Sequence, residues 1–114
     1  MMRILAGLLA LMSANGCRQT PSIGVRLEPR QGTTRITLLV PPSLKVNARL
    51  LPALELEDGR IVRFDQGQLT PDSSYFVSPP FATVPFLADT VHGILRLGVC
   101  PRNLLVCEPR VIKL

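Results

Sequence analysis

Residues 53–64, ALELEDGRIVRF, carry the clearest structural signal in this chain of 114 residues. Two runs with strand-like composition, 53–57 and 60–64, are separated by the dipeptide Asp58-Gly59. This dipeptide favours the tight turn that joins two antiparallel strands. We therefore expect a β-hairpin with a two-residue turn here, and β structure in the sequence around it.

Two further segments alternate in the way that a half-buried strand requires. Residues 33–40 (TTRITLLV) and 93–99 (GILRLGV) place every second apolar side chain on one face of an extended chain. Pro52 cannot donate to a strand ladder, so we expect the chain to bend, to bulge or to lie at a sheet edge there. Shorter strands are predicted at 75–77, 85–88, 104–106 and 110–114.

The whole pattern predicts an all-β domain. Seven or eight short strands, together with 11 prolines and 8 glycines, favour a small antiparallel β-sandwich of immunoglobulin-like character. In such a sandwich the alternating apolar faces of two sheets bury one another. Outside the first 16 residues no segment has convincing helical periodicity, so we predict no helix in this domain.

The N-terminal segment has the features of an export signal. Arg3 precedes an apolar run at 4–12, and the small-residue stretch 13–16 leads to Cys17. The apolar run is too short to cross a bilayer. We therefore expect export of the mature chain and not a membrane span.

The end of this signal resembles the lipobox of bacterial lipoproteins, which implies cleavage before Cys17 and lipid attachment to its sulfur and amine. The resemblance departs at Ala14 and Asn15, so a plain secretory signal is the alternative. The resulting division is a signal peptide at 1–16, a tether at 17–23 and a β-sandwich at 24–114. Lipid on Cys17 would hold the protein at the periplasmic side of the cell envelope, and Arg18 favours the outer membrane.

The charge excludes some partners without choosing one. The chain has 13 Lys and Arg and 8 Asp and Glu; removing Arg3 with the signal leaves 12 against 8, a net charge of +4. These charges are scattered, and export argues against a nucleic acid partner. A periplasmic or envelope protein and anionic lipid headgroups are compatible partners. No phosphate-binding loop is present, and we predict no small-molecule substrate and no cofactor.

Cys100 and Cys107 form an even set once Cys17 carries lipid. In an oxidising compartment we expect them to form a disulfide, across a turn that Pro101 and Asn103 favour. Such a bond would stabilise the fold by about 2.5 kcal/mol in the loop-entropy account. Arg102 beside it would favour a thiolate and raise the reactivity of a nearby cysteine.

The run 93–100 (GILRLGVC), the later Cys107-Glu108-Pro109 and the final apolar strand resemble the end of the periplasmic N-terminal domain of DsbD thiol:disulfide interchange proteins. This resemblance implies an immunoglobulin-like sandwich, with Cys100 and Cys107 as a redox pair. The chain departs from that family in having one residue more between the cysteines. It also lacks the expected aromatic and acidic neighbours, although Phe76 or Phe81 would be candidates for a cap over the sulfurs.

Two functions therefore stay open. The first is thiol:disulfide exchange with a periplasmic partner through Cys100 and Cys107. The second is a non-enzymatic envelope lipoprotein that acts as a protein-interaction module, with the same bond as a structural staple. The segment 41–47 (PPSLKVN) is similar to one in small β domains of some thioredoxin-like NHL-repeat proteins, which implies the sandwich but no electron transfer.

The other polar residues form no recognisable catalytic set. His92 is the single histidine, and a zinc site would need more ligands than His92, Cys100 and Cys107 supply at this spacing. Hydrolytic catalysis would require His92 to meet a serine and an acid from 72–74 or Asp89. We predict no metal site, and we expect the carboxylates at 55–58 to face solvent.

Overall fold

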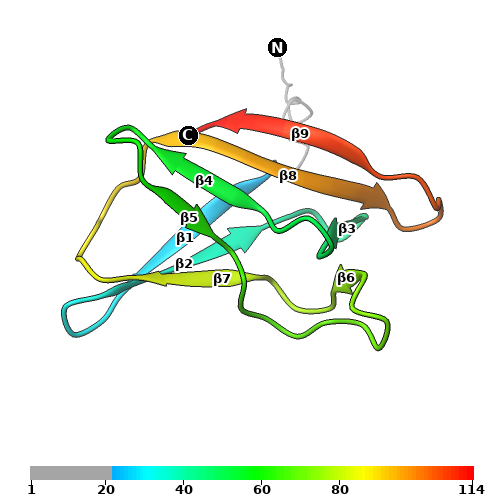
Figure 1. Ribbon diagram of the computed structural model, residues 1–114, viewed down its shortest axis with the longest axis horizontal. Coiled ribbons are helices and arrows are strands. Elements are labelled where there is room, and N and C mark those ends of the chain that lie inside the picture. The colour runs from blue at the N-terminus through cyan, green and yellow to red at the C-terminus, as the bar shows by residue number, and fades with distance from the viewer. Residues whose placement is uncertain (1–21) are drawn as a thin grey trace, which may run out of the picture.

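The computed structural model describes residues 22–114, which form nine β-strands and no helix (Figure 1). In this part of the chain there is accordingly no helix long and apolar enough to cross a membrane. The predicted signal peptide, Cys17 and the tether up to residue 21 lie outside the described residues. The strands are β1 (Gly24–Pro29), β2 (Thr34–Leu39), β3 (Leu44–Asn47), β4 (Ala53–Leu56), β5 (Ile61–Arg63), β6 (Tyr75–Phe76), β7 (Phe81–Val84), β8 (Gly93–Pro101) and β9 (Glu108–Lys113).

All strand pairs are antiparallel, and they form two sheets. The smaller sheet has the order β1-β2-β7. The larger sheet is built around β8, which pairs along one edge with β4 and β3 and along the other edge with β9. The predicted all-β antiparallel sandwich is confirmed, and its immunoglobulin-like character stays a prediction.

The core lies between the two sheets and follows the alternation of the sequence. Ile36 and Leu38 of β2 face Leu95 and Val99 of β8, and all four are almost completely buried. Phe64, directly after β5, is the largest fully buried side chain. The remaining core residues are Ile23, Val46, Leu54, Val62, Phe76, Ala82, Val84 and Leu97.

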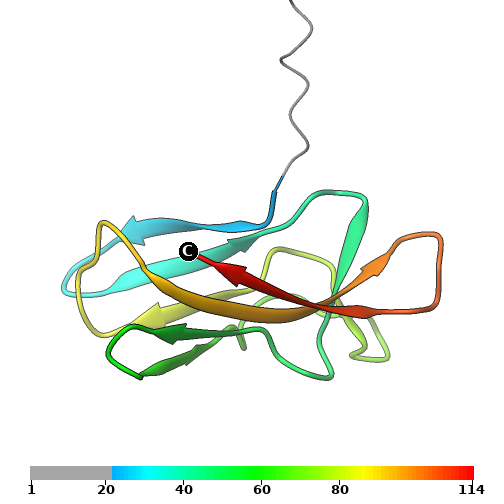
Figure 2. The ribbon, with the colours of Figure 1, turned by 90° about the horizontal axis from the view of Figure 1, so that it is seen from above.

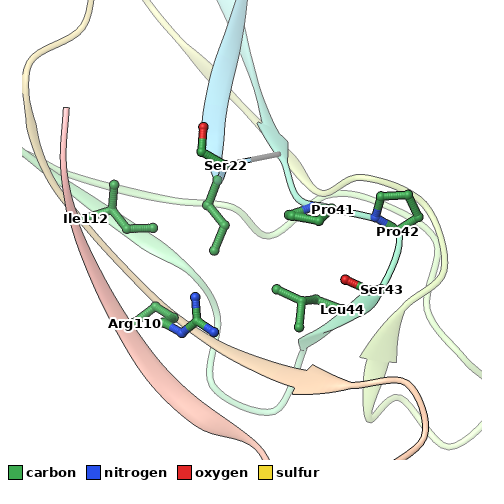
Figure 3. Close-up of a pocket in the computed structure, with 8 residues that line it drawn as sticks. Ser22, Pro41, Pro42, Ser43, Leu44, Arg110 and Ile112 are labelled. Atoms are coloured by element: carbon green, nitrogen blue, oxygen red, sulfur yellow. The ribbon is translucent and has the colours of Figure 1, made fainter. Parts of the chain in front are cut away.

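The two long sides of the sandwich differ. On one side Gln66 and Phe81 exchange two backbone hydrogen bonds of 3.1 and 2.9 Å, which tie the chain after β5 to β7 of the other sheet. On the other side the edge strands β1 and β9 do not pair. There the start of β1 and the inward face of β9 border a hollow of about 620 Å³, lined partly by Pro41 and Ile112 (Figure 3).

The predicted hairpin is confirmed, but its turn is one residue longer than expected. The Leu56 N–H donates to the Arg60 carbonyl (2.8 Å), and the Gly59 N–H donates to the Leu56 carbonyl (2.9 Å). The loop is therefore residues 57–59. Gly59 has a φ of 91°, the left-handed conformation of the bulge that ends a three-residue hairpin loop. The prediction of a two-residue turn was wrong because the glycine occupies this bulge position.

Two predicted short strands are loops. Residues 85–88 form a loop beside the first residue of β2, Thr34. The Thr34 hydroxyl donates to the Phe86 carbonyl (2.7 Å) and accepts a hydrogen bond from the Ala88 N–H (2.9 Å). Residues 104–106 form the loop between β8 and β9. The neighbouring strand β7 lies at Phe81–Val84, before the proline that the prediction placed at a strand start.

Replacing Thr34 by valine should destabilise the protein by about 1–2 kcal/mol. Thr34 is fully buried, and its loss would leave the Phe86 carbonyl and the Ala88 N–H without their partner. Urea unfolding measures the change. Thr83→Val is the control, because Thr83 lies exposed on β7 and should change stability by less than about 0.5 kcal/mol. Equal effects of the two variants would contradict the structural role of the Thr34 hydroxyl.

Candidate functional site

Cys100 of β8 and Cys107, directly before β9, form a disulfide, as the sequence predicted. Their Cα atoms are 4.1 Å apart. The last paired position between the two strands is Val99 with Glu108, so the cysteines occupy the next opposed position of the same ladder. The bond thus closes the loop 101–106.

The two sulfurs differ in exposure. Cys100 is fully buried, whereas Cys107 is only half-buried. An incoming thiolate from another protein would therefore approach Cys107 and expel the sulfur of Cys100. A thiolate formed at Cys100 would lose its hydration, which is costly for a charged group in an apolar surrounding. This geometry gives more support to a structural bond than to an exchanging one.

Arg102 is engaged away from the sulfurs. Its Nε donates to the Pro42 carbonyl at 2.5 Å, and its backbone N–H donates to the Ser43 carbonyl at 3.1 Å. These bonds fasten the loop between β8 and β9 to the segment that precedes β3. The predicted effect of Arg102 on the cysteine thiols gains no support from this arrangement.

The predicted aromatic cap over the sulfurs also gains no support. Phe81 lies on the outer face of the smaller sheet, where the guanidinium of Arg35 stacks 3.9 Å from its ring centroid. Phe76 is buried in the core beside Val46. Each ring thus has a packing role of its own.

A groove of about 630 Å³ opens beside Cys107 on the outer face of the larger sheet. Its lining includes two small residues, Ala53 of β4 and Gly98 of β8. A Cβ atom on Gly98 would lie 3.3 Å from the Asn47 side chain, so glycine keeps this position open. Register aligns one row of side chains across four strands: Arg63, Ala53, Arg96 and Val111.

Positive charge and exposed apolar surface meet at the rim of this groove. Leu50 is 72% and Val111 is 66% exposed. Arg96 forms an ion pair with Glu55 (3.1 Å) that is too exposed to neutralise it fully. The three ion pairs found within residues 22–114 do not include Arg63, whose side chain lines the groove. The rim therefore favours an anionic or acidic binding partner.

The groove also contains a charge pair that cancels. Arg110 Nη2 lies 2.8 Å from Glu108 Oε1, and both residues line the groove near Cys107. Arg49 instead donates from Nε to the Ser74 hydroxyl (3.1 Å). This hydrogen bond to a neutral hydroxyl leaves the charge of Arg49 in place, so Arg49 and Arg63 are the two groove arginines that none of the ion pairs found within residues 22–114 includes.

The serine and acid residues considered for hydrolysis form a turn. The hydroxyl of Thr70 donates to Asp72 (2.8 Å), and the Ser74 N–H donates to the same oxygen (3.0 Å). The Thr70 hydroxyl, followed by the Ser74 N–H, lowers the pKa of Asp72 below its usual value. Within residues 22–114 no hydrogen bond joins His92 to this turn, and His92 is exposed. His92 is therefore a surface histidine, and the hydrogen bonds found among the described residues do not join it to this serine and acid as hydrolytic catalysis would require.

The carboxylates of the hairpin are solvent-facing, as predicted. Glu55 pairs with Arg96, Glu57 is exposed in the loop, and Asp58 accepts the Arg60 N–H at 3.0 Å. This backbone hydrogen bond lowers the pKa of Asp58. Across residues 22–114, the His, Cys, Asp and Glu side chains form no group of three or more that could hold a metal ion.

No family model, curated protein or solved structure matches this chain. Its site is therefore interpreted from its own geometry. The sequence indicated the disulfide but not the groove, whose row of residues depends on strand order. The small residues Ala53 and Gly98 within strand-like runs were the one signal that pointed to it.

Proposed function

We propose that this protein is a non-enzymatic lipoprotein of the bacterial cell envelope that binds a partner protein in the groove on its larger sheet. The lipid anchor is proposed at Cys17, from the sequence that precedes it. The disulfide between Cys100 and Cys107 is then a structural bond that fixes β8 and β9, two of the strands that form the groove. The burial of Cys100 supports this role.

The groove itself carries the proposal. It combines small residues in its lining, exposed apolar side chains at the rim and the positive charges of Arg49 and Arg63. The small side chains at Ala53 and Gly98 let an extended backbone approach the sheet there, and the arginines attract carboxylates. We infer that the bound segment is an extended acidic stretch of another envelope protein.

Arg63→Glu should weaken binding of an acidic peptide by about tenfold or more, because it reverses one of the two groove charges that are in no ion pair. The probe is a fluorescent peptide that alternates glutamate with leucine, and fluorescence anisotropy with the full chain measures its affinity. A matched peptide with lysine in place of glutamate should bind far more weakly.

Arg26→Glu is the matched control for this experiment. Arg26 is exposed on β1 of the other sheet, so the same change in net charge should leave binding nearly unchanged. Gly98→Leu should abolish binding by filling the groove. Equal affinity for both peptides, or equal effects of the two arginine variants, would refute the groove as the binding site.

Thiol:disulfide exchange is the second candidate, favoured by the half-exposed Cys107 at the edge of the groove and by the resemblance to the DsbD domain. A partner thiolate would attack Cys107 Sγ, form a mixed disulfide and expel Cys100 as a thiolate that takes a proton from water. A second thiol of the partner would then displace Cys107. The partner dithiol would be oxidised to a disulfide, and Cys100 and Cys107 would be reduced.

A further inference from the structure

We propose that the apolar tip of the loop between β8 and β9, formed by Leu104, Leu105 and Val106, inserts into the bilayer that carries the protein's own lipid anchor. This inference rests on the proposed lipidation of Cys17. It adds a second membrane contact and an orientation of the domain on the membrane.

The apolar tip is exposed to an unusual degree. Leu104, Leu105 and Val106 are 52%, 91% and 71% exposed. Single exposed apolar residues are common on protein surfaces, but a contiguous apolar patch usually marks a binding site. Within residues 22–114 this is the only run of three consecutive large apolar residues that are all exposed. The other exposed large apolar residues are Leu50, Ile61, Leu69, Val77, Leu87 and Val111.

The segment 42–43 lies near both the base of the tip and the start of the described chain. Ser22, the first described residue, lines the open-side hollow together with Pro42 and Ser43 (Figure 3). Arg102, two residues before the tip, donates hydrogen bonds to the carbonyls of the same Pro42 and Ser43. The start of the domain therefore borders the same hollow as residues 42–43, and the base of the tip is hydrogen-bonded to them.

The length of the tether limits how far the domain stands from its anchor. Five residue steps separate Cys17 from Ser22, and a fully extended chain spans at most about 3.3–3.6 Å per residue, or about 18 Å in total. A lipidated Cys17 thus holds Ser22, and the residues beside it, close to the headgroups. The β8–β9 loop lies at one end of the domain (Figures 1 and 2), and its base is hydrogen-bonded to Pro42 and Ser43, which border the same hollow as Ser22, so the bilayer is the apolar medium within its reach.

The charge and the rigidity of the loop fit the same partner. Arg102 at its base is exposed and positively charged, and the sequence of the tether contains the positively charged Arg18, so both would be attracted to anionic headgroups. The disulfide and the Arg102 hydrogen bonds hold the loop at its base. Less conformational freedom is then lost when the tip enters the interface.

A single tryptophan reports where the tip lies, because the chain has no tryptophan of its own. The experiment uses the full lipidated chain carrying Leu105→Trp, reconstituted into vesicles of phosphatidylcholine with a minority of phosphatidylglycerol. We expect a blue-shifted emission and strong quenching when the lipids carry bromine on their acyl chains. Bromine quenches only at short range, so quenching requires entry into the bilayer.

Leu87→Trp is the matched control. Leu87 is 62% exposed, and its loop between β7 and β8 lies at the opposite end of the molecule from the apolar tip in both ribbon views (Figures 1 and 2). Its emission should match that of an exposed tryptophan, with little quenching. Thermal unfolding of both variants checks that the fold is unchanged.

The outcomes separate the tip from the anchor. If the protein does not float with the vesicles, the lipid anchor fails and the tip proposal falls with it. If it floats but Leu105→Trp is quenched no more than Leu87→Trp, the anchor stands and the tip proposal is overturned. A blue shift without bromine quenching would also overturn it, since the tip would then be covered by protein.

Discussion

Phe64→Ala should lower the free energy of unfolding by about 3–5 kcal/mol, the range observed when a buried phenylalanine is truncated. Phe64 is fully buried directly after β5, and its N–H donates to the carbonyl of the buried Pro52 (3.0 Å). The cavity would open at the centre of the core. A domain of this size has a total stability of only about 5–15 kcal/mol, so the variant should be close to unfolding at 37 °C.

Urea unfolding followed by circular dichroism measures this change. Phe64→Leu is the control, because it keeps an apolar side chain in the same place and should cost clearly less than the alanine variant. A loss below about 1 kcal/mol for Phe64→Ala would show that the core is not packed around this ring.

Removal of the disulfide by Cys100→Ala combined with Cys107→Ala should cost about 2.5 kcal/mol, from the loop entropy of residues 100–107. The bond lies one position beyond the last pair of β8 and β9, Val99 with Glu108, and closes the loop between them. The loss of stability should therefore be greatest in that hairpin. Because the proposed role of the bond is structural, the variant should still bind the acidic peptide wherever it remains folded.

Dithiothreitol provides the internal comparison for this second prediction. Reduction of the unmodified protein should lower its stability by a similar amount, and the doubly substituted variant should not respond. Hydrogen exchange would locate the loosened region at β8 and β9. A variant that keeps full stability but loses the ability to exchange disulfides would instead favour the redox function.

The strands that could be predicted are those with one buried face. The alternation in 33–40 and 93–99 reappears as the buried side chains of β2 and β8, because a period of two is the direct result of covering one face. β1 and β3 were not predicted. Their side chains are mostly half-buried on both faces, so neither segment shows a clean alternation.

Apolar composition alone misplaced two segments. Residues 104–106 have the composition of a strand, but the pairing of β8 with β9 ends before them, at Val99 and Glu108. They therefore lie in the connecting loop, where they are exposed. The strand pairing with β2 ends at Val84, and in residues 85–88 the Phe86 carbonyl accepts a hydrogen bond from the Thr34 hydroxyl while the Ala88 N–H donates one to it. In both cases the result depended on a partner distant in sequence, which local pattern does not contain.

Of the two parts of the candidate site, the disulfide could be predicted from the sequence and the groove could not. The disulfide was predicted from the number of cysteines and from the export that the N-terminal sequence led us to expect, and both come from the sequence alone. The groove arises because Arg63 of β5, Ala53 of β4 and Arg96 of β8 align across neighbouring strands. Strand order and register set that row, and neither was determined by the sequence.

The most direct test of the proposed function is the equilibrium reduction potential of the Cys100–Cys107 pair in the intact protein. The measurement would use dithiothreitol or glutathione buffers and count free thiols by alkylation mass. A structural bond with a buried sulfur should have a potential below about −300 mV. A value between about −120 and −270 mV, the range of exchange proteins, would contradict the structural role and favour thiol:disulfide exchange.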